Sequence, residues 1–212
     1  PALSNVLMIS LKMMLSIPLG EAMAYPKTTR SYFAFIEVLF RNQLETIVKL
    51  PTGTFLRMIE ALREGMLSLD NTITVYCAST IDHLASYQFR VARRNKPEAV
   101  ALTQHLASCP NIFSEFLTML FRKLIFEGSE SYWSLSRPVL SIILADEQAY
   151  ENTKSYLAAT QPPQNHPLMQ KEFEKLLANI DRNLEPTNRD RFTQCMTAMR
   201  NEMKKFLVQL NE

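Results

Sequence analysis

Apolar residues recur along most of the chain at spacings of three and four, which places them on one side of an α-helix. No convincing run alternates strictly between apolar and polar residues, as a half-buried strand would. The clearest helical series are Phe33, Ile36, Phe40, Leu44 and Ile47; Phe55, Met58, Ile59, Leu62, Met66 and Leu69; Ile73, Cys77, Ile81 and Leu84; and Phe113, Phe116, Leu117, Leu120 and Leu124. The pattern predicts an all-α protein.

Prolines and glycines separate these apolar series at intervals, mostly where a proline is tolerated at a helix start. They divide the chain into about ten helices, with longer loops near residues 91–97 and 160–167. Ten helices would form about five antiparallel pairs of roughly 42 residues, the length of HEAT and armadillo units. We therefore predict an α-solenoid of about five HEAT/armadillo-like pairs that runs as one segment through residues 1–212. An irregular helical bundle is the alternative.

Residues 3–24 are predicted to form a buried helix. Lys12 is the only charged residue among residues 1–20. Asn5, Lys12 and Pro18 argue against a membrane span, and Glu21 together with the lack of a basic leader argues against a signal peptide. Because this start is apolar and opens with Pro1 in place of methionine, we expect that the chain is a fragment of a longer solenoid.

A second apolar stretch, residues 133–148, contains Pro138. If Ser134 or Ser136 caps the helix, Pro138 falls in its first turn, where a missing N–H costs nothing. The residues after it are almost all apolar: Val139, Leu140, Ile142, Ile143 and Leu144. This helix is expected to lie between neighbouring helices.

The sequence NLEPTNRDRF, residues 183–192, predicts the start of the last helix. Thr187 and Asp190 have the spacing of a capping-box variant, and Pro186 ends the preceding segment. The helix carries an apolar stripe at Phe192, Met196, Met199, Met203, Phe206 and Leu210. Capping leaves Arg189 and Arg191 unexplained. We expect them to form ion pairs between repeats, with contact to a binding partner as the alternative.

Charge is nearly balanced, with 23 basic and 21 acidic residues and a formal net charge of +2. This balance argues against nucleic acid as a partner. One basic cluster stands out, formed by Arg90, Arg93, Arg94 and Lys96. It could bind an acidic partner, although cations at a helix C-terminus also complement the helix dipole, and that interpretation is favoured.

Residues suited to catalysis or metal binding are scattered. The three cysteines are far apart from one another in sequence, and so are the three histidines: Cys77, Cys109 and Cys195; His83, His105 and His166. They show neither CxxC nor HxxxH spacing, and no glycine-rich phosphate loop occurs. The sequence therefore predicts no catalytic residues, no metal site and no cofactor.

Four long segments carry a family resemblance: SIPLGEAMAYPKTTRSYFAFIEVL, GMLSLDNTI, IFEGSESYWSLSRPVLSIILADE and IDRNLEPTNRDRFTQ. In this order and spacing they resemble the C-terminal region of the exportin-7-like branch of the Ran-binding nuclear transport receptors, in the importin-β superfamily. The resemblance covers essentially the whole chain.

This resemblance implies a HEAT-repeat receptor that binds Ran in its GTP form together with protein cargo. It implies passage through the nuclear pore by contact with nucleoporins, and shuttling between nucleus and cytoplasm without membrane insertion. The chain would be the C-terminal fragment of such a receptor, and it would not be an enzyme. A HEAT-repeat scaffold for another multiprotein complex is the alternative function.

Overall fold

Helices form all the regular secondary structure in the computed structural model, which describes residues 2–92, 97–127 and 131–208. The elements are α1 (Ala2–Ser16), α2 (Leu19–Met23), α3 (Pro26–Asn42), α4 (Leu44–Ile47), α5 (Thr52–Met66), α6 (Asn71–Val91), α7 (Pro97–Ala107), α8 (Ile112–Phe121), a π-helical turn η1 (Arg122–Phe126), α9 (Tyr132–Ala145), α10 (Glu147–Ala159), a 3₁₀ turn η2 (Pro163–Asn165), α11 (His166–Leu177) and α12 (Pro186–Met203). The predicted all-α fold is confirmed.

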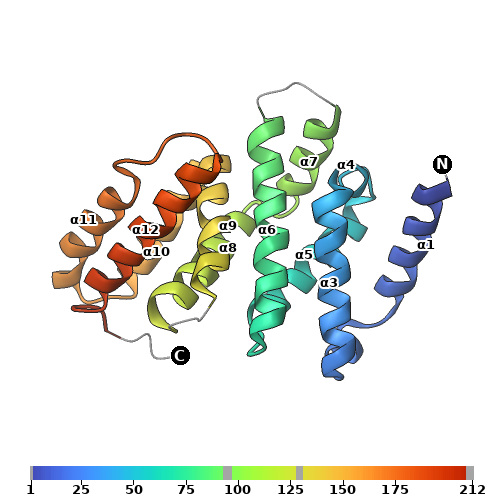
Figure 1. The fold of residues 1–212 in the computed structure, drawn as a ribbon, viewed down its shortest axis with the longest axis horizontal. Helices are drawn as coiled ribbons and strands as arrows, with labels where there is room; N and C mark the ends of the chain where they lie inside the picture. The colour runs from blue at the N-terminus through green and yellow to red at the C-terminus, as the bar shows by residue number, and fades with distance from the viewer. Residues whose placement is uncertain (1, 93–96, 128–130, 209–212) are drawn as a thin grey trace.

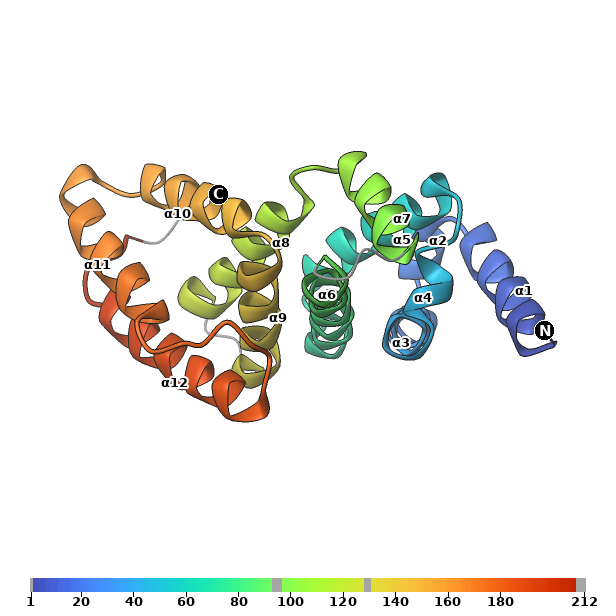
Figure 2. The same ribbon diagram turned by 90° about the horizontal axis from the view of Figure 1, so that it is seen from above.

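From α3 onward, every third helix lies on the same face of the molecule. Helices α3, α6, α9 and α12 lie side by side on one face of the molecule, while α5, α7, α8 and α10 lie on the opposite face (Figures 1 and 2). Consecutive helices pack as hairpins in α2–α3, α5–α6, α8–α9 and α11–α12. This stacking is the solenoid that the sequence predicts. The described residues do not confirm the number of five pairs.

One continuous apolar core runs through the stack, from Leu11 in α1 to Met203 in α12. Helix α6 lies between α3 and α9 and is buried along most of its length (Figure 1). Most of the apolar positions predicted to face the core are buried. In the stripe predicted for the last helix, Phe206 is only half-buried because α12 ends at Met203, and Leu210 lies outside the described residues. Leu69 is fully exposed. Because α5 ends at Met66, the helical spacing that would have turned Leu69 inward no longer applies.

Three helices approach closely at Gly65 of α5. A β-carbon at this position would lie 2.6 Å from Cε1 of Phe33 in α3 and closer still to Sγ of Cys77 in α6. Phe33 and Cys77 are both buried. Gly65 therefore serves helix packing, because only a residue without a β-carbon fits between these two side chains.

Helix α9 differs from its predicted start. It begins at Tyr132 after Ser131, so Pro138 lies inside the helix and neither Ser134 nor Ser136 is its cap. The expected placement of Pro138 in the first turn is wrong. Ser136 Oγ instead hydrogen-bonds with Thr193 Oγ1 of α12 at 2.8 Å. The expected packing is confirmed, since the residues from Val139 to Leu144 are all buried.

The predicted single N-terminal helix is two helices, α1 and α2, that are separated at Ile17 and Pro18. Nor is α1 fully buried as expected: Leu11 and Leu15 face the core, whereas Ile9 and Met13 are exposed. No helix among the described residues is long and apolar enough to cross a membrane.

Candidate functional site

Arg189 of α12 is the centre of a polar cluster that joins three layers of the stack. Its Nη1 lies 3.0 and 3.1 Å from the two carboxylate oxygens of Asp82 in α6. Its Nη2 donates to Ser86 Oγ at 3.0 Å, and its Nε donates to the carbonyl of Leu184 at 3.2 Å. Asp82 and Ser86 are four residues apart and therefore share one side of α6.

Helix α9 completes this cluster through Ser141, which donates to Asp82 Oδ1 and lies 3.1 Å from Ser86 Oγ. The Arg189 and Asp82 side chains are only 11% and 16% exposed. The expected ion pair between repeats is thus present for Arg189. All three of its guanidinium nitrogens are engaged inside the chain, which leaves it little capacity for a binding partner.

Arg191 behaves differently. Its Nη1 donates to the carbonyl of Asn179 at 3.1 Å and lies 3.5 Å from Asp181 Oδ2, and both partners belong to the loop before α12. The expected ion pair between repeats is therefore wrong for Arg191. Residues two apart in a helix point in nearly opposite directions, so Arg189 faces α6 while Arg191 faces outward.

The predicted capping box at Thr187 and Asp190 is also wrong. Glu185 is the residue before the helix, Pro186 is its first residue, and no side chain caps the first turn. Proline at the first helical position fixes the start one residue earlier than Thr187. Asp190 instead pairs with Arg137 of α9, at 3.5 Å from Nη2.

Asn188 holds the loop before α12 and had no recognisable signal in the sequence. Its Oδ1 accepts from the amide of Asp181 at 3.0 Å, and its Nδ2 donates to the carbonyls of Asp181 and Asn183, both at 2.8 Å. The side chain is buried, and its hydrogen bonds satisfy backbone groups that have no partner within a helix. Asn188 thereby fixes the entry of α12 and the position of Arg189.

The basic cluster after α6 is described only in part. Arg90 is exposed in the last turn of α6, where a cation complements the helix dipole. Arg93, Arg94 and Lys96 lie outside the described residues. Contact between these four cations and an acidic partner remains a prediction.

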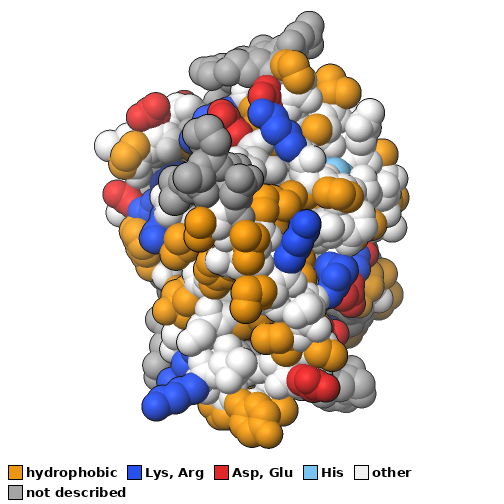
Figure 3. All heavy atoms as spheres, turned by 90° about the vertical axis from the view of Figure 1, so that its right-hand side faces the viewer, with side chains coloured by type: hydrophobic (Ala, Val, Ile, Leu, Met, Phe, Trp, Pro, Cys, Tyr) orange, Lys and Arg blue, Asp and Glu red, His pale blue; other side chains and the backbone are white. Residues whose placement is uncertain are grey.

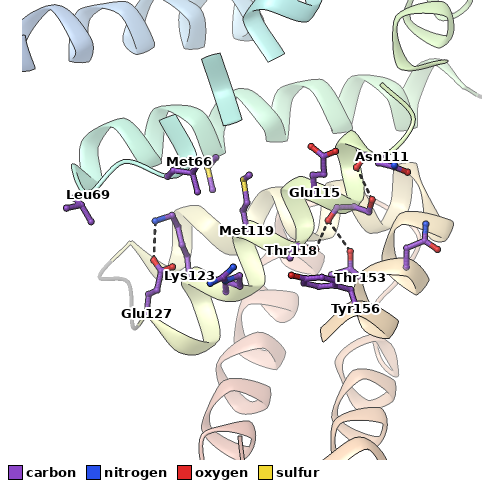
Figure 4. Close-up of a pocket in the computed structure, with 14 residues that line it drawn as sticks. Met66, Leu69, Asn111, Glu115, Thr118, Met119, Lys123, Glu127, Thr153 and Tyr156 are labelled. Atoms are coloured by element: carbon purple, nitrogen blue, oxygen red, sulfur yellow. Dashed lines mark hydrogen bonds and ion pairs between the residues drawn. The ribbon is translucent and has the colours of Figure 1, made fainter. Parts of the chain in front are cut away.

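A groove opens on the other face, between the C-terminal end of α5 and the elements α8, η1 and α10 (Figure 4). Its volume is about 1010 Å³. Apolar side chains line one part of it, including Met119 and the exposed Leu69 and Tyr156. Here α8 continues into the π-helical turn η1, which supplies Arg122 and Lys123 to the wall.

Charged pairs border this groove. Lys123 Nζ lies 3.2 Å from Glu127 Oε2, and Arg63 Nε of α5 lies 2.7 Å from Glu115 Oε2 of α8. Arg122 forms no ion pair with the described residues. The groove can therefore accept apolar side chains beside an acidic group, as a peptide segment would offer.

The histidines are separate and serve local structure. His105 is buried, and its ring nitrogens lie 2.9 Å from Thr52 Oγ1 and 2.9 Å from the carbonyl of Val48. His166 Nε2 lies 2.9 Å from the carbonyl of Gln161. Within the described part of the chain, no group of three or more metal-binding side chains is assembled.

His83 makes the stability of the folded state depend on pH. Burial lowers the pKa of His83 from its ordinary value of 6.5, and this outweighs the opposing effect of Asp82 and of Glu37, whose Oε1 lies 3.7 Å from Nε2. Because the pKa of His83 is lower in the folded state, its contribution to stability is present above pH 6.5 and is lost as the pH falls below it.

We expect His83→Gln to lose less stability than the wild type when urea unfolding is compared at about pH 7 and about pH 5.5. His105 and His166 are unchanged in the variant, so the difference between the two proteins isolates His83. An equal loss in both proteins would contradict the assigned pKa shift.

Comparison with known proteins finds relatives along nearly the whole chain. It is 31% identical over 210 residues to exportin-7-B of Xenopus laevis, which covers 95% of this chain and 19% of the relative. It is 28% identical over 213 residues to Ran-binding protein 17 of Mus musculus, which covers 96% and 20%. It is 25% identical over 213 residues to Ran-binding protein 16 of Drosophila melanogaster, which covers 95% and 19%.

The chain thus spans about a fifth of the length of these relatives. No family model matches the chain. No solved structure matches it either. The similarity nevertheless covers 95–96% of the chain. The chain is homologous to a segment of exportin-7 and its Ran-binding relatives.

Proposed function

We propose that the chain is the C-terminal part of a nuclear transport receptor, which carries protein cargo through the nuclear pore in a manner that depends on Ran in its GTP form. The observation that carries the proposal is the similarity to exportin-7 and to Ran-binding proteins over 95–96% of the chain. The stacked helices support it, because an extended solenoid offers a large surface to protein partners.

The proposed role needs no catalytic residue and no cofactor. Direction of transport comes from differential affinity, in which Ran bound to GTP stabilises the receptor conformation that binds cargo. Small rotations between stacked hairpins add up along a solenoid, so the receptor changes curvature without breaking its core. Its partners are Ran, protein cargo and nucleoporins, and it shuttles between nucleus and cytoplasm.

Recovery of Ran from solution tests this function. The longer polypeptide that contains residues 1–212 is immobilised and exposed to Ran locked in its GTP form or its GDP form. We expect at least about tenfold stronger binding of the GTP form, a coupling of about 1.4 kcal/mol.

Equal recovery of the two forms, or recovery of neither, would overturn the transport function. The alternative, a HEAT-repeat scaffold for another complex, would then account for the fold. Catalytically inactive Ran loaded with either nucleotide is the matched control, since it removes hydrolysis during the assay.

A further inference from the structure

The groove between α5 and α8 continues into a second hollow of about 490 Å³. Leu56 and Ile59 of α5 and Pro110 before α8 line this hollow, which shares Asn111 and Glu115 with the groove. The two hollows therefore follow one another along α5 and α8. An elongated hollow between neighbouring helices suits a segment of polypeptide better than a compact small molecule.

The centre of the groove is apolar. Met66 of α5 and Met119 of α8 point into it (Figure 4). Leu67, Leu69 and Tyr156 add apolar surface to its walls, although they are 63%, 104% and 51% exposed. Methionine is unbranched and fits apolar side chains of different shapes, and apolar groups exposed together mark binding surfaces.

Arg122 gives the groove a positive charge that no described residue neutralises. The other charged residues of its lining are paired, Lys123 with Glu127 at 3.2 Å and Glu115 with Arg63 of α5 at 2.7 Å. The Arg122 side chain is only partly exposed, so a charge beside it is incompletely screened by water. A carboxylate complements this arginine best, because guanidinium and carboxylate form two parallel hydrogen bonds.

A π-helical turn holds this arginine in the groove wall. In η1 the amide of Glu127 donates to the carbonyl of Arg122, five residues back, at 3.2 Å. Leu124 and Ile125 of the same turn are buried and fix it to the core, while Arg122 and Lys123 line the groove. Such turns are rare and lie frequently at functional sites. The backbone irregularity and the exposed apolar surface therefore point independently to the same place.

We propose that this groove binds a short segment of a partner protein that carries apolar side chains and a carboxylate. The apolar side chains pack on Met66 and Met119, and the carboxylate pairs with Arg122 at the η1 end of the groove. An uncharged segment would leave Arg122 without a partner and is disfavoured for that reason. The inference goes beyond the proposed function, since neither Ran nor passage through the nuclear pore enters it.

Selection from a random-peptide display library tests the proposal. The library is bound to the longer polypeptide that contains residues 1–212, after removal of peptides that bind its variant with Leu69→Ser and Arg122→Gln combined. This counter-selection is needed because hydrophobic side chains also gather at the α1 end of the stack (Figure 3). We expect the selected peptides to be enriched at least about threefold in Asp and Glu beside apolar residues.

The affinity of one selected peptide separates the charge from the apolar contact. A second peptide is identical except that amides replace its carboxylates. We expect the amide peptide to bind at least about fivefold more weakly. Arg122→Gln should weaken the acidic peptide by the same factor and leave the amide peptide unchanged within about twofold. Leu69→Ser should weaken both peptides at least about threefold, because it removes only an apolar contact.

Arg191→Gln and Leu168→Ser are the matched controls. Arg191 of α12 and Leu168 of α11 are exposed as well, but they lie outside the groove. Neither substitution should change the affinity of either peptide by more than about twofold. Circular dichroism and urea unfolding verify folding. Because Leu69 is fully exposed and Arg122 forms no ion pair with the described residues, both groove variants should unfold at the wild-type urea concentration.

Equal affinity of the acidic and amide peptides for the wild-type protein would overturn the proposal, and so would a selection that yields no acidic peptides. A phenylalanine-glycine peptide that binds as tightly as the acidic one, and that Leu69→Ser weakens, would assign the groove to nucleoporins instead. A dimer in sedimentation that Leu69→Ser dissolves would assign it to a second copy of the chain. Loss of Ran recovery with peptide binding intact would contradict only the proposed function.

Discussion

Replacing Arg189 with alanine is expected to lower the free energy of unfolding by about 2–3 kcal/mol. The guanidinium pairs with both carboxylate oxygens of Asp82 and donates to Ser86 Oγ. These contacts join α12 directly to α6. Its removal leaves the Asp82 carboxylate, whose side chain is 16% exposed, without its cationic partner. Urea unfolding followed by circular dichroism measures the loss.

Arg191→Ala is the matched control, two residues away on the same helix. Arg191 is 48% exposed and pairs at 3.5 Å with an exposed carboxylate, so its loss should cost less than about 0.5 kcal/mol. A double-mutant cycle between Arg189→Ala and Asp82→Ala separates the pair from the rest of the cluster. Equal costs for the two arginines, or a coupling energy near zero between Arg189 and Asp82, would contradict the role assigned to this ion pair.

The sequence predicts the fold class well because helix periodicity is local. The buried positions of α5, such as Phe55 and Leu62, follow directly from spacing, and so does the stripe of α12 at Phe192 and Met196. Residue spacing no longer predicts burial beyond the point where a helix ends. Leu69 continues the periodic series of α5 but lies beyond its last turn, and it is exposed.

For the candidate residues, the sequence could predict the type of contact but not the residue that makes it. Arg189 was expected to form an ion pair between repeats, but its partner Asp82 is 107 residues away in sequence and only stacking of the helices brings them together. Asn188 was missed for a related reason. Its three hydrogen bonds reach back to a loop whose path is set by the packing of α11 on α12.

Helix starts were the least predictable local feature. At both Pro138 and Pro186 the sequence suggested a serine or threonine cap, and in both helices the observed start lies further toward the N-terminus. Proline is compatible with several positions near a helix start, so it marks the region without fixing the first residue. In α9, burial between neighbouring helices outweighs the backbone hydrogen bond that Pro138 cannot make.

Replacing Gly65 with alanine is expected to destabilise the chain by about 2 kcal/mol or more. An added β-carbon would overlap Phe33 and Cys77, which are themselves buried, and such overpacking costs about 3 kcal/mol. The higher helix propensity of alanine returns about 1 kcal/mol. The net loss should appear in urea unfolding, together with faster hydrogen exchange where α3, α5 and α6 meet.

Gly53→Ala is the control for this substitution, because it makes the same chemical change in the same helix. Apart from its chain neighbours and the nearby backbone of its own helix, no atom lies within 4 Å of a β-carbon at Gly53, and the residue is exposed. Alanine there should leave stability unchanged or raise it by less than about 1 kcal/mol. The change in stability is therefore expected to have opposite signs at the two glycines. At Gly53 only the higher helix propensity of alanine acts, whereas at Gly65 the steric overlap dominates. If Gly65→Ala were as well tolerated as Gly53→Ala, the three helices could separate at little cost, and the close approach at Gly65 would not be what fixes their packing.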